Sequence, residues 1–382
     1  MNLDTICVHG SGNNPDYTGS LSVPIYQTAT FAHKGVGEST GYDYSRVQNP
    51  TREKLEELIG TLEGGAGAAA FSSGMAAFSA MTALFSPGDH LIVSDDLYGG
   101  VVRYFHTIAA KNGIEFDFVN TSHLPEIAAN IKPNTKAIYV ETPTNPMLQV
   151  TDIAACAALA GEHGLLLAVD NTFLTPYLQK PLALGADIVL HSGTKFLGGH
   201  NDTLAGFLVT RSEELIEKIR FISKTVGSML APFDAWLLIR GIKTLAVRMD
   251  KIEENTRKIA HFLLNCKKVK KVYYTGFENH PEFAISKSQA RGFGGVISFE
   301  VDSRETAEHI LNHVKLIYFA ESLGGTDSLI TYPFLQTHAD VPAAVRDKKG
   351  INDKLLRLSI GIENAEDLIQ DLEQAFSMGG RE

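Results

Sequence analysis

Between about residue 67 and residue 210, short apolar runs alternate with segments whose apolar residues recur every three or four positions. The short runs predict buried strands, and the recurrence predicts amphipathic helices such as GMAAFSAMTALF and DIAACAALAGEHG. The predicted strands are GAAAFS, HLIVSD, IEFDFVN, KAIYVET, LLLAVDN, DIVLHSG and LAGFLVT. This alternation predicts a mainly parallel sheet with helices on both faces. The last two strands follow each other directly, which indicates an antiparallel strand at one edge.

The pattern differs on either side of this region. The first residues lack periodicity, and SGNNPDYTGS is typical of a polar loop. TREKLEELIGTLEGG then predicts a helix with Thr51 as its N-cap. One long helix is expected over roughly 233–264, followed by the strands KKVYYTG, GGVISFEV, KLIYFAES and KLLRLSIGI, with helices around 303–314 and 364–377. We therefore expect three parts: an N-terminal arm (1–50), an α/β domain (51–240) and a smaller C-terminal α+β domain (241–382).

Composition narrows the class of protein. The net charge is −10 and the sequence has no basic stripe, which argues against a nucleic-acid partner. The three cysteines are far apart, which argues against a disulfide scaffold or a zinc site and fits a reducing cytoplasm. The start MNLDTICVHG lacks a signal-peptide pattern, and no apolar run reaches the length of a membrane span. We expect a cytoplasmic protein without a membrane or nucleic-acid partner.

Polar and reactive side chains follow the predicted parallel strands. Ligands of open α/β sheets collect at the carboxyl ends of the strands, so these residues should meet at one edge. They are Ser72 to Met75, Asp95, Asp96, Tyr98, Thr142 to Asn145, Asp170 to Thr172, and Ser192 to Lys195.

This set suits pyridoxal 5'-phosphate (PLP). A lysine in a dry site has a lowered pKa and can form a Schiff base with an aldehyde, which is the role we predict for Lys195. Asp170 could keep the pyridine nitrogen protonated. The helix start after Ser-Ser-Gly could cradle the phosphate, helped by the hydroxyls of Ser192 and Thr194. Tyr98 could stack on the ring.

Each of these residues also fits a structural role when it is taken alone. Lys195 could be a solvated surface residue, Asp170 a helix cap and Tyr98 a packing residue. Other enzyme classes fit less well: AFSSGM lacks the first glycine of a serine-hydrolase elbow. His191 and His200 are not at helical metal-ligand spacing, so no metal is expected. Only the coincidence at one sheet edge favours PLP chemistry.

A set of motifs spread over nearly the whole chain gives a family resemblance. The motifs are DYSRVQNPTR, FSSGMAA, DLYGG, ETPTNP, VDNTF, HSGTKFLGGHND, AESLGG, THAD and LLRLSIGIE. In this order they resemble the Cys/Met-metabolism family of PLP enzymes, which includes cystathionine γ-synthase, cystathionine γ- and β-lyases, methionine γ-lyase and O-acylhomoserine sulfhydrylases. The resemblance implies PLP fold type I (aspartate aminotransferase-like) and a homotetramer built as a dimer of dimers.

The resemblance also implies roles for individual residues. Lys195 would hold the cofactor covalently and shuttle protons, Asp170 would pair with the ring nitrogen, and Tyr98 would stack on the ring. A bidentate Arg357 would clamp the substrate α-carboxylate. The remaining implied contacts are Gly74, Met75, Ser192 and Thr194 to the phosphate, Tyr44 and Arg46 to the phosphate of the neighbouring subunit, and Asn145 and Ser322 to the substrate.

The reaction type depends on features around the substrate's distal end. Glu321 could hold the ammonium group of cysteine or cystathionine, which favours chemistry at the γ-carbon. Val47 replaces an arginine that contacts the succinyl group in some cystathionine γ-synthases, so O-acetyl- or phosphohomoserine is favoured. We predict γ-replacement on an O-acylhomoserine with cysteine (or sulfide), giving cystathionine (or homocysteine). The alternative is a cystathionine γ-lyase or β-lyase.

Overall fold

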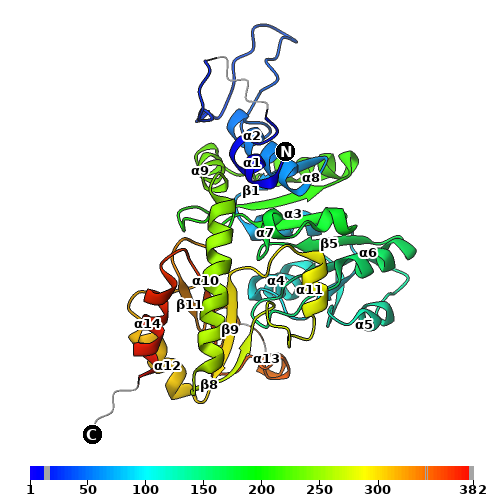
Figure 1. The fold of residues 1–382 in the computed structure, drawn as a ribbon. Coiled ribbons are helices and arrows are strands. Elements are labelled where there is room, and N and C mark those ends of the chain that lie inside the picture. The colour runs from blue at the N-terminus through cyan, green and yellow to red at the C-terminus, as the bar shows by residue number, and fades with distance from the viewer. Residues whose placement is uncertain (13–17, 340, 342, 378–382) are drawn as a thin grey trace.

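The computed structural model describes residues 1–12, 18–339, 341 and 343–377. The ribbon contains two sheets, and the long helix α10 (Leu245–Asn265) runs alongside both (Figure 1). The polar loop predicted for 11–20 includes residues 13–17, which lie outside the described residues. The division of the chain into domains at residues 50 and 240 stays a prediction.

The larger sheet is mainly parallel, as predicted. In the described part of the chain its strand order is β1-β7-β6-β5-β4-β2-β3. Its strands are β1 (Gly67–Phe71), β2 (His90–Ser94), β3 (Glu115–Val119), β4 (Thr135–Glu141), β5 (Leu166–Asp170), β6 (Ile188–Ser192) and β7 (Gly206–Thr210). All seven match predicted strands. The antiparallel strand is β7, but it lies second from the edge, so its predicted edge position was wrong. Every residue of β7 is buried, and β1 pairs with its second side.

Helices cover both faces of this sheet because consecutive side chains of a strand point to opposite faces. Ala68 and Ala70 of β1 pack with one apolar cluster, whereas Ala69 and Phe71 pack with another. The covering elements are α1 (Leu3–His9), α2 (Pro50–Glu63), α3 (Gly74–Thr82), α4 (Gly99–Tyr104), the π-helix η1 (Phe105–Ala109), α5 (Leu124–Ala129), α6 (Ile153–Glu162), α7 (Thr175–Leu178), the 3-10 helix η2 (Pro181–Leu184), α8 (Glu213–Val226) and α9 (Pro232–Ile242).

The smaller sheet has the order β10-β11-β12-β9-β8 in the described residues. Its strands are β8 (Val269–Tyr273), β9 (Val296–Val301), β10 (Tyr318–Phe319), β11 (Leu329–Thr331) and β12 (Leu355–Ser359). The accompanying helices are α11 (Phe283–Gln289), α12 (Arg304–His313), α13 (Ala343–Lys349) and α14 (Ala365–Phe376). Among the described strands of this sheet, only β11 has no counterpart among the predicted strands. Residues of α10, α12 and α14 complete one apolar cluster with this sheet.

Two helix boundaries differ from the prediction. α2 begins at Pro50, and the Asn49 side chain accepts hydrogen bonds from the amides of Thr51 (3.0 Å) and Arg52 (3.4 Å). Asn49 is therefore the N-cap, and Thr51 lies in the first turn. The long helix predicted for 233–264 is two helices, because α9 ends at Ile242 and α10 begins at Leu245.

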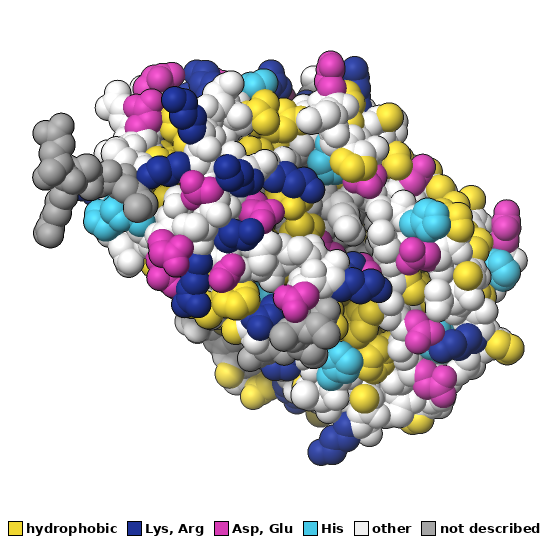
Figure 2. Space-filling view, turned by 90° about the horizontal axis from the view of Figure 1, so that it is seen from below, with side chains coloured by type: hydrophobic (Ala, Val, Ile, Leu, Met, Phe, Trp, Pro, Cys, Tyr) yellow, Lys and Arg dark blue, Asp and Glu magenta, His cyan; other side chains and the backbone are white. Residues whose placement is uncertain are grey.

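On the face shown in Figure 2, basic side chains are interspersed with acidic ones. None of the helices in the described ranges combines the length and the apolarity that crossing a membrane requires.

Arg248 explains the break between α9 and α10. Its side chain is 3% exposed and donates from Nη2 to Gly241 O (2.9 Å), at the end of α9. It also donates from Nη1 to Phe196 O (2.7 Å) and from Nε to the Thr244 hydroxyl (3.1 Å). One buried guanidinium thus holds the helix junction against the loop that follows β6.

We expect the R248M variant to be destabilised, because Met fills the space but leaves the buried Phe196 carbonyl without its donor, whereas Gly241 O keeps its hydrogen bonds from Thr244. The midpoint of thermal unfolding should fall by about 5 °C. K258M on the same helix is the control, since Lys258 makes an exposed ion pair with Glu254 that adds little stability. Equal midpoints for the two variants would show that the Arg248 hydrogen bonds contribute nothing measurable.

Candidate active site

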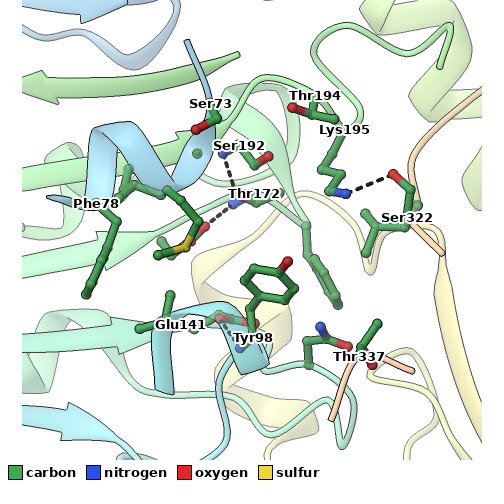
Figure 3. Close-up of a pocket in the computed structure, with 18 of the residues that line it drawn as sticks. Ser73, Phe78, Tyr98, Glu141, Thr172, Ser192, Thr194, Lys195, Ser322 and Thr337 are labelled. Atoms are coloured by element: carbon green, nitrogen blue, oxygen red, sulfur yellow. Dashed lines mark hydrogen bonds between the residues drawn. The ribbon is translucent and has the colours of Figure 1, made fainter. Parts of the chain in front are cut away.

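The carboxyl ends of the parallel strands open on a cavity of about 230 Å³ that residues of the C-terminal third close from the other side. Most of the predicted site residues line it: Gly74, Met75, Tyr98, Asn145, Asp170, Ser192, Thr194, Lys195, Glu321, Ser322 and Arg357. Figure 3 shows Ser73, Ser192 and Thr194 on one side of this cavity and Tyr98 on the other. Residues far apart in the sequence are therefore brought together around one space.

The start of α3 forms a cradle for an anion. The Ser73 hydroxyl accepts a hydrogen bond from the amide of Ala76 (3.0 Å), which caps the helix. The amides of Gly74 and Met75, in the first turn, have no intrahelical acceptor. The backbone packs so closely that a Cβ atom at residue 206 would lie 2.1 Å from Ser73 O. Free amides at a helix start suit a phosphate, so this end of the cavity fits the expected cofactor.

Lys195 is held in the middle of the cavity. Its Nζ donates a hydrogen bond to the Ser322 hydroxyl (2.8 Å; Figure 3). Desolvation and the nearby positive charge of Arg357 lower the lysine pKa to about 8, while Glu321 opposes this shift. An amine with this pKa is partly neutral at physiological pH, and only the neutral form is nucleophilic. The chemistry of Lys195 therefore fits attachment to an aldehyde.

Ser322 holds two functional groups through an unusual backbone conformation. Its φ angle is 94°, a region that residues other than glycine rarely adopt. The Ser322 hydroxyl faces Lys195, while its carbonyl accepts a hydrogen bond from Arg357 Nη2 (2.8 Å). Such backbone strain, which costs roughly 1–3 kcal/mol, concentrates at functional sites.

Two carboxyl groups lie side by side at the strand ends. Glu141 of β4 is in register with Asp170 of β5. Asp170 accepts hydrogen bonds from the Thr172 amide (2.9 Å) and the Tyr139 hydroxyl (3.3 Å). Burial raises the pKa of both carboxyl groups, and the neighbouring Asp170 raises the pKa of Glu141 further. Among the described residues no basic side chain forms an ion pair with Asp170, although the charge of His191 acts to lower its pKa. A protonated ring nitrogen would supply a positive charge next to this carboxyl group.

Arg357 lies on β12 at the opposite wall. It is 1% exposed and donates from Nη1 to the Asn145 side chain (2.7 Å) and from Nη2 to Thr331 Oγ1 (3.2 Å). Burial lowers its pKa to about 10, so it remains charged at neutral pH. Its Nε has no hydrogen-bond partner among the described residues. A fixed guanidinium with an unused donor suits a carboxylate ligand.

Tyr98 and Glu321 are the more exposed members of the site. Tyr98 comes just before α4, its amide donates to Glu141 Oε2 (3.2 Å), and its side chain is 43% exposed. Glu321 is exposed and adjoins Ser322, so its carboxylate lies near the charges of Lys195 and Arg357. A flat ring and a carboxylate at the solvent side can contact a bound ring and a cationic ligand.

Tyr44 and Arg46 do not line this cavity. Arg46 Nη1 donates to Lys224 O (2.6 Å), and its guanidinium carbon lies 5.6 Å from the centre of the Tyr44 ring. They belong to the N-terminal segment that projects from the rest of the chain in Figure 1. Their assignment to a neighbouring subunit's cofactor stays a prediction.

Three residues of the site received no role from the sequence. Glu141 is the last residue of β4 but lies one residue before the end of the predicted strand KAIYVET. Thr172 accepts a hydrogen bond from the Ser192 amide (2.8 Å), which joins two strand ends. Thr337 comes from the THAD motif and lines the cavity, whereas Asp340 of that motif lies outside the described residues. Strand-end position was the available signal for the first two.

Comparison with known proteins gives consistent matches. Residues 4–377 match the family described as Cys/Met metabolism PLP-dependent enzyme. The chain is 51% identical to cystathionine gamma-lyase of Bacillus subtilis (strain 168), covering 98% of this chain and 99% of the relative. It is 49% identical to cystathionine beta-lyase of Lactococcus lactis subsp. cremoris (strain MG1363), covering 98% of each. It is also 49% identical to cystathionine gamma-synthase/O-acetylhomoserine (thiol)-lyase of B. subtilis (strain 168), covering 96% and 94%.

A solved structure agrees with these matches. The structure of cystathionine gamma-lyase from Lactobacillus plantarum, complexed with L-serine, superposes with a TM-score of 0.96 at 47% identity, covering 98% of each chain. The fold is therefore PLP fold type I (aspartate aminotransferase-like), as predicted. Because a family profile and relatives near 50% identity both span almost its full length, the chain belongs to the Cys/Met metabolism family of PLP-dependent enzymes, with pyridoxal 5'-phosphate as its expected cofactor.

Proposed function

We propose that the protein is a transferase that catalyses γ-replacement on an O-acylhomoserine, with cysteine or sulfide as the incoming thiol. The product would be cystathionine or homocysteine. The observation that carries this proposal is the Glu321 carboxylate on the solvent side of Lys195 and Arg357. It offers a partner for a second ammonium group beyond the γ-carbon of the substrate.

The residues around the cavity would hold the cofactor. Bound PLP supplies an electron sink that stabilises negative charge on the substrate's Cα. The amides of Gly74 and Met75, with the hydroxyls of Ser192 and Thr194, bind the phosphate. Asp170 keeps a proton on the ring nitrogen, and Tyr98 packs against the ring.

The same cavity would orient the substrate and move its protons. Arg357 binds the α-carboxylate, and Asn145 keeps the guanidinium in place. Lys195 Nζ takes the proton from Cα, while the Ser322 hydroxyl keeps that amine directed at the carbon. The acyloxy group would leave Cγ as a carboxylate and the thiol sulfur would add to Cγ. Lys195 Nζ would then return the proton to Cα, and the proton of the thiol would be released with the acid.

A C–S lyase is the second candidate. It is favoured by the names of two relatives, a γ-lyase at 51% identity and a β-lyase at 49% identity. Glu321 could equally hold the distal ammonium of cystathionine in that reaction. Val47 stands where a contact for a succinyl group would be expected, so we favour O-acetyl- or phosphohomoserine for the transferase.

We also propose a homotetramer, built as a dimer of dimers, in which Tyr44 and Arg46 reach the phosphate bound by the neighbouring subunit. Arg46 is exposed and belongs to the projecting segment, which supports this arrangement.

Cys7, Cys156 and Cys266 are free thiols, which is consistent with our expectation of a cytoplasmic protein.

The K195A variant tests covalent chemistry at this lysine. It should bind PLP through the phosphate contacts yet lose turnover by several orders of magnitude, because no other group at the cavity centre can move the Cα proton. The absorbance band of the lysine-bound cofactor near the visible region should disappear. Near wild-type turnover in K195A would contradict the proposed role.

The R357K variant tests the carboxylate clamp. An ammonium group cannot make the paired hydrogen bonds of a guanidinium, so the KM of the amino-acid substrate should rise by roughly tenfold to a hundredfold. The affinity for PLP, measured by titrating the apoenzyme, should change little. An unchanged KM for every amino-acid substrate would refute the clamp.

The E321A variant tests the role of Glu321, and product analysis separates the two candidate reactions. Reaction with cysteine should slow by roughly tenfold or more, whereas reaction with sulfide, which brings no ammonium, should be nearly unaffected. Cystathionine formed from O-acetylhomoserine and cysteine supports the transferase, while pyruvate or 2-oxobutyrate as the dominant product from cystathionine supports a lyase. Equal losses for cysteine and sulfide would contradict the role of Glu321.

A further inference from the structure

The segment after β11 carries the THAD motif across the wall of the active-site cavity. Its turn is closed by backbone hydrogen bonds from Gln336 N to Tyr332 O and from His338 N to Pro333 O, both 3.0 Å. Thr337 lines the cavity and lies near Tyr98 in Figure 3. His338, the next residue, points away from solvent and is 2% exposed.

The His338 ring makes three polar contacts. Its Nε2 lies 3.2 Å from Leu97 O and 3.2 Å from Asn145 O. Its Nδ1 lies 2.9 Å from the Thr337 hydroxyl. Because carbonyl oxygens only accept, Nε2 must carry the hydrogen, and Nδ1 can then accept from the hydroxyl. The contacts therefore specify one neutral tautomer that donates to two carbonyls at once.

These carbonyls belong to the two loops that carry site residues. Leu97 immediately precedes Tyr98, whose ring faces the cavity. The Asn145 side chain receives the hydrogen bond from Arg357 Nη1 at 2.7 Å. A single imidazole N–H thus joins the loop that carries Tyr98 to the loop that carries Asn145, the partner of Arg357.

The segment is also fixed tightly against the start of α4. A Cβ atom at residue 99 would lie only 2.2 Å from Thr337 O, so only glycine fits there. Further along the segment, Lys349 at the end of α13 forms an ion pair with Asp95, and the Lys349 side chain is 9% exposed. The segment is therefore attached to the β2–α4 loop on both sides of His338.

Burial and the charge of Arg357 lower the pKa of His338 to about 4. The ring consequently stays neutral at physiological pH and keeps both its donor and its acceptor. A charged imidazole would lose the acceptor that binds the Thr337 hydroxyl.

We propose that His338 is a positioning residue of the active site, which sets Tyr98 and the Asn145–Arg357 pair through its bifurcated N–H hydrogen bond. It lines no part of the cavity itself and acts through these neighbours. The inference rests on the proposed role of Arg357 as the carboxylate clamp, but it holds for a transferase and for a lyase, since both substrates carry the α-carboxylate.

The test compares two substitutions of His338 in the holoenzyme. Leu in H338L has a similar volume and no donor, whereas the amide nitrogen of Gln in H338Q can take the place of Nε2. We expect H338L to raise the KM of the amino-acid substrate by roughly tenfold, the effect of about one buried hydrogen bond, with kcat less affected. The visible circular dichroism of the bound cofactor should also weaken, because the Tyr98 ring is no longer held. H338Q should restore both readouts.

A second buried histidine provides the matched control. His90 is fully buried at the opposite end of β2, where it contacts Thr135 (2.8 Å) and Asp117 (3.2 Å). H90L should lower the thermal midpoint as H338L does, yet leave KM and the circular dichroism unchanged. If H338L behaves like H90L in all three measurements, or if H338Q is as impaired as H338L, the proposal is overturned.

Two further variants keep the test decisive. If H338L does not accumulate as folded protein, H338N replaces it, because the Asn amide corresponds to Nδ1 and is too short to reach either carbonyl. An unchanged KM in H338N overturns the proposal.

The R357K H338L double variant should raise KM by less than the product of the fold increases seen in the two single variants, since both substitutions act on one clamp. If KM rises in R357K but is normal in H338L, the positioning role of His338 is refuted and the clamp stands. If KM is normal in R357K, the clamp itself is refuted.

Discussion

The removal of charged groups from water is the constraint on which this structure depends. Lys195, Asp170 and Arg357 all line one small cavity. Burial lowers the pKa of Lys195 and of Arg357 and raises the pKa of Asp170, so it favours the neutral form of each group. Burying such groups is costly unless fixed dipoles and hydrogen bonds replace water. The ends of β4, β5 and β6, the start of α3 and the turn at Ser322 supply those dipoles, so the reactive groups are held in place by the core of the protein.

Rigid connections between the two sheets keep these dipoles aligned. Arg357 comes from the smaller sheet, while its partner Asn145 follows a strand of the larger one. Arg248 fastens α10 to the loop carrying Lys195 through Phe196 O. His338 and Lys349 fasten the C-terminal segment to the loop that precedes Tyr98. A movement of the smaller sheet would therefore displace substrate-binding groups relative to the cofactor-binding strands.

The buried and the exposed parts of the site have different consequences for specificity. We assign the buried groups to the phosphate and ring of the cofactor and to the α-carboxylate of the substrate. In our proposal the distal end of the substrate lies near Glu321, which is exposed. Relatives near 50% identity nevertheless carry the names of a γ-lyase, a β-lyase and a γ-synthase. Identity over the whole chain therefore does not separate these reactions.

The sequence by itself determined the described strands apart from β11, the parallel character of the larger sheet, the family and most residues that line the cavity. It could do so because apolar periodicity reports local structure, and because parallel strands bring their carboxyl ends to one edge whatever their order. The break between α9 and α10, where Arg248 joins Gly241 O to Phe196 O, and the inner position of β7, which pairs with β1, appeared only in the tertiary structure. The same is true of the site's finer geometry. The Glu141–Asp170 pair, the strained Ser322 that faces both Lys195 and Arg357, and the His338 bridge all join segments far apart in the chain. Only packing decides which side chain faces which, and no local pattern in the sequence records it.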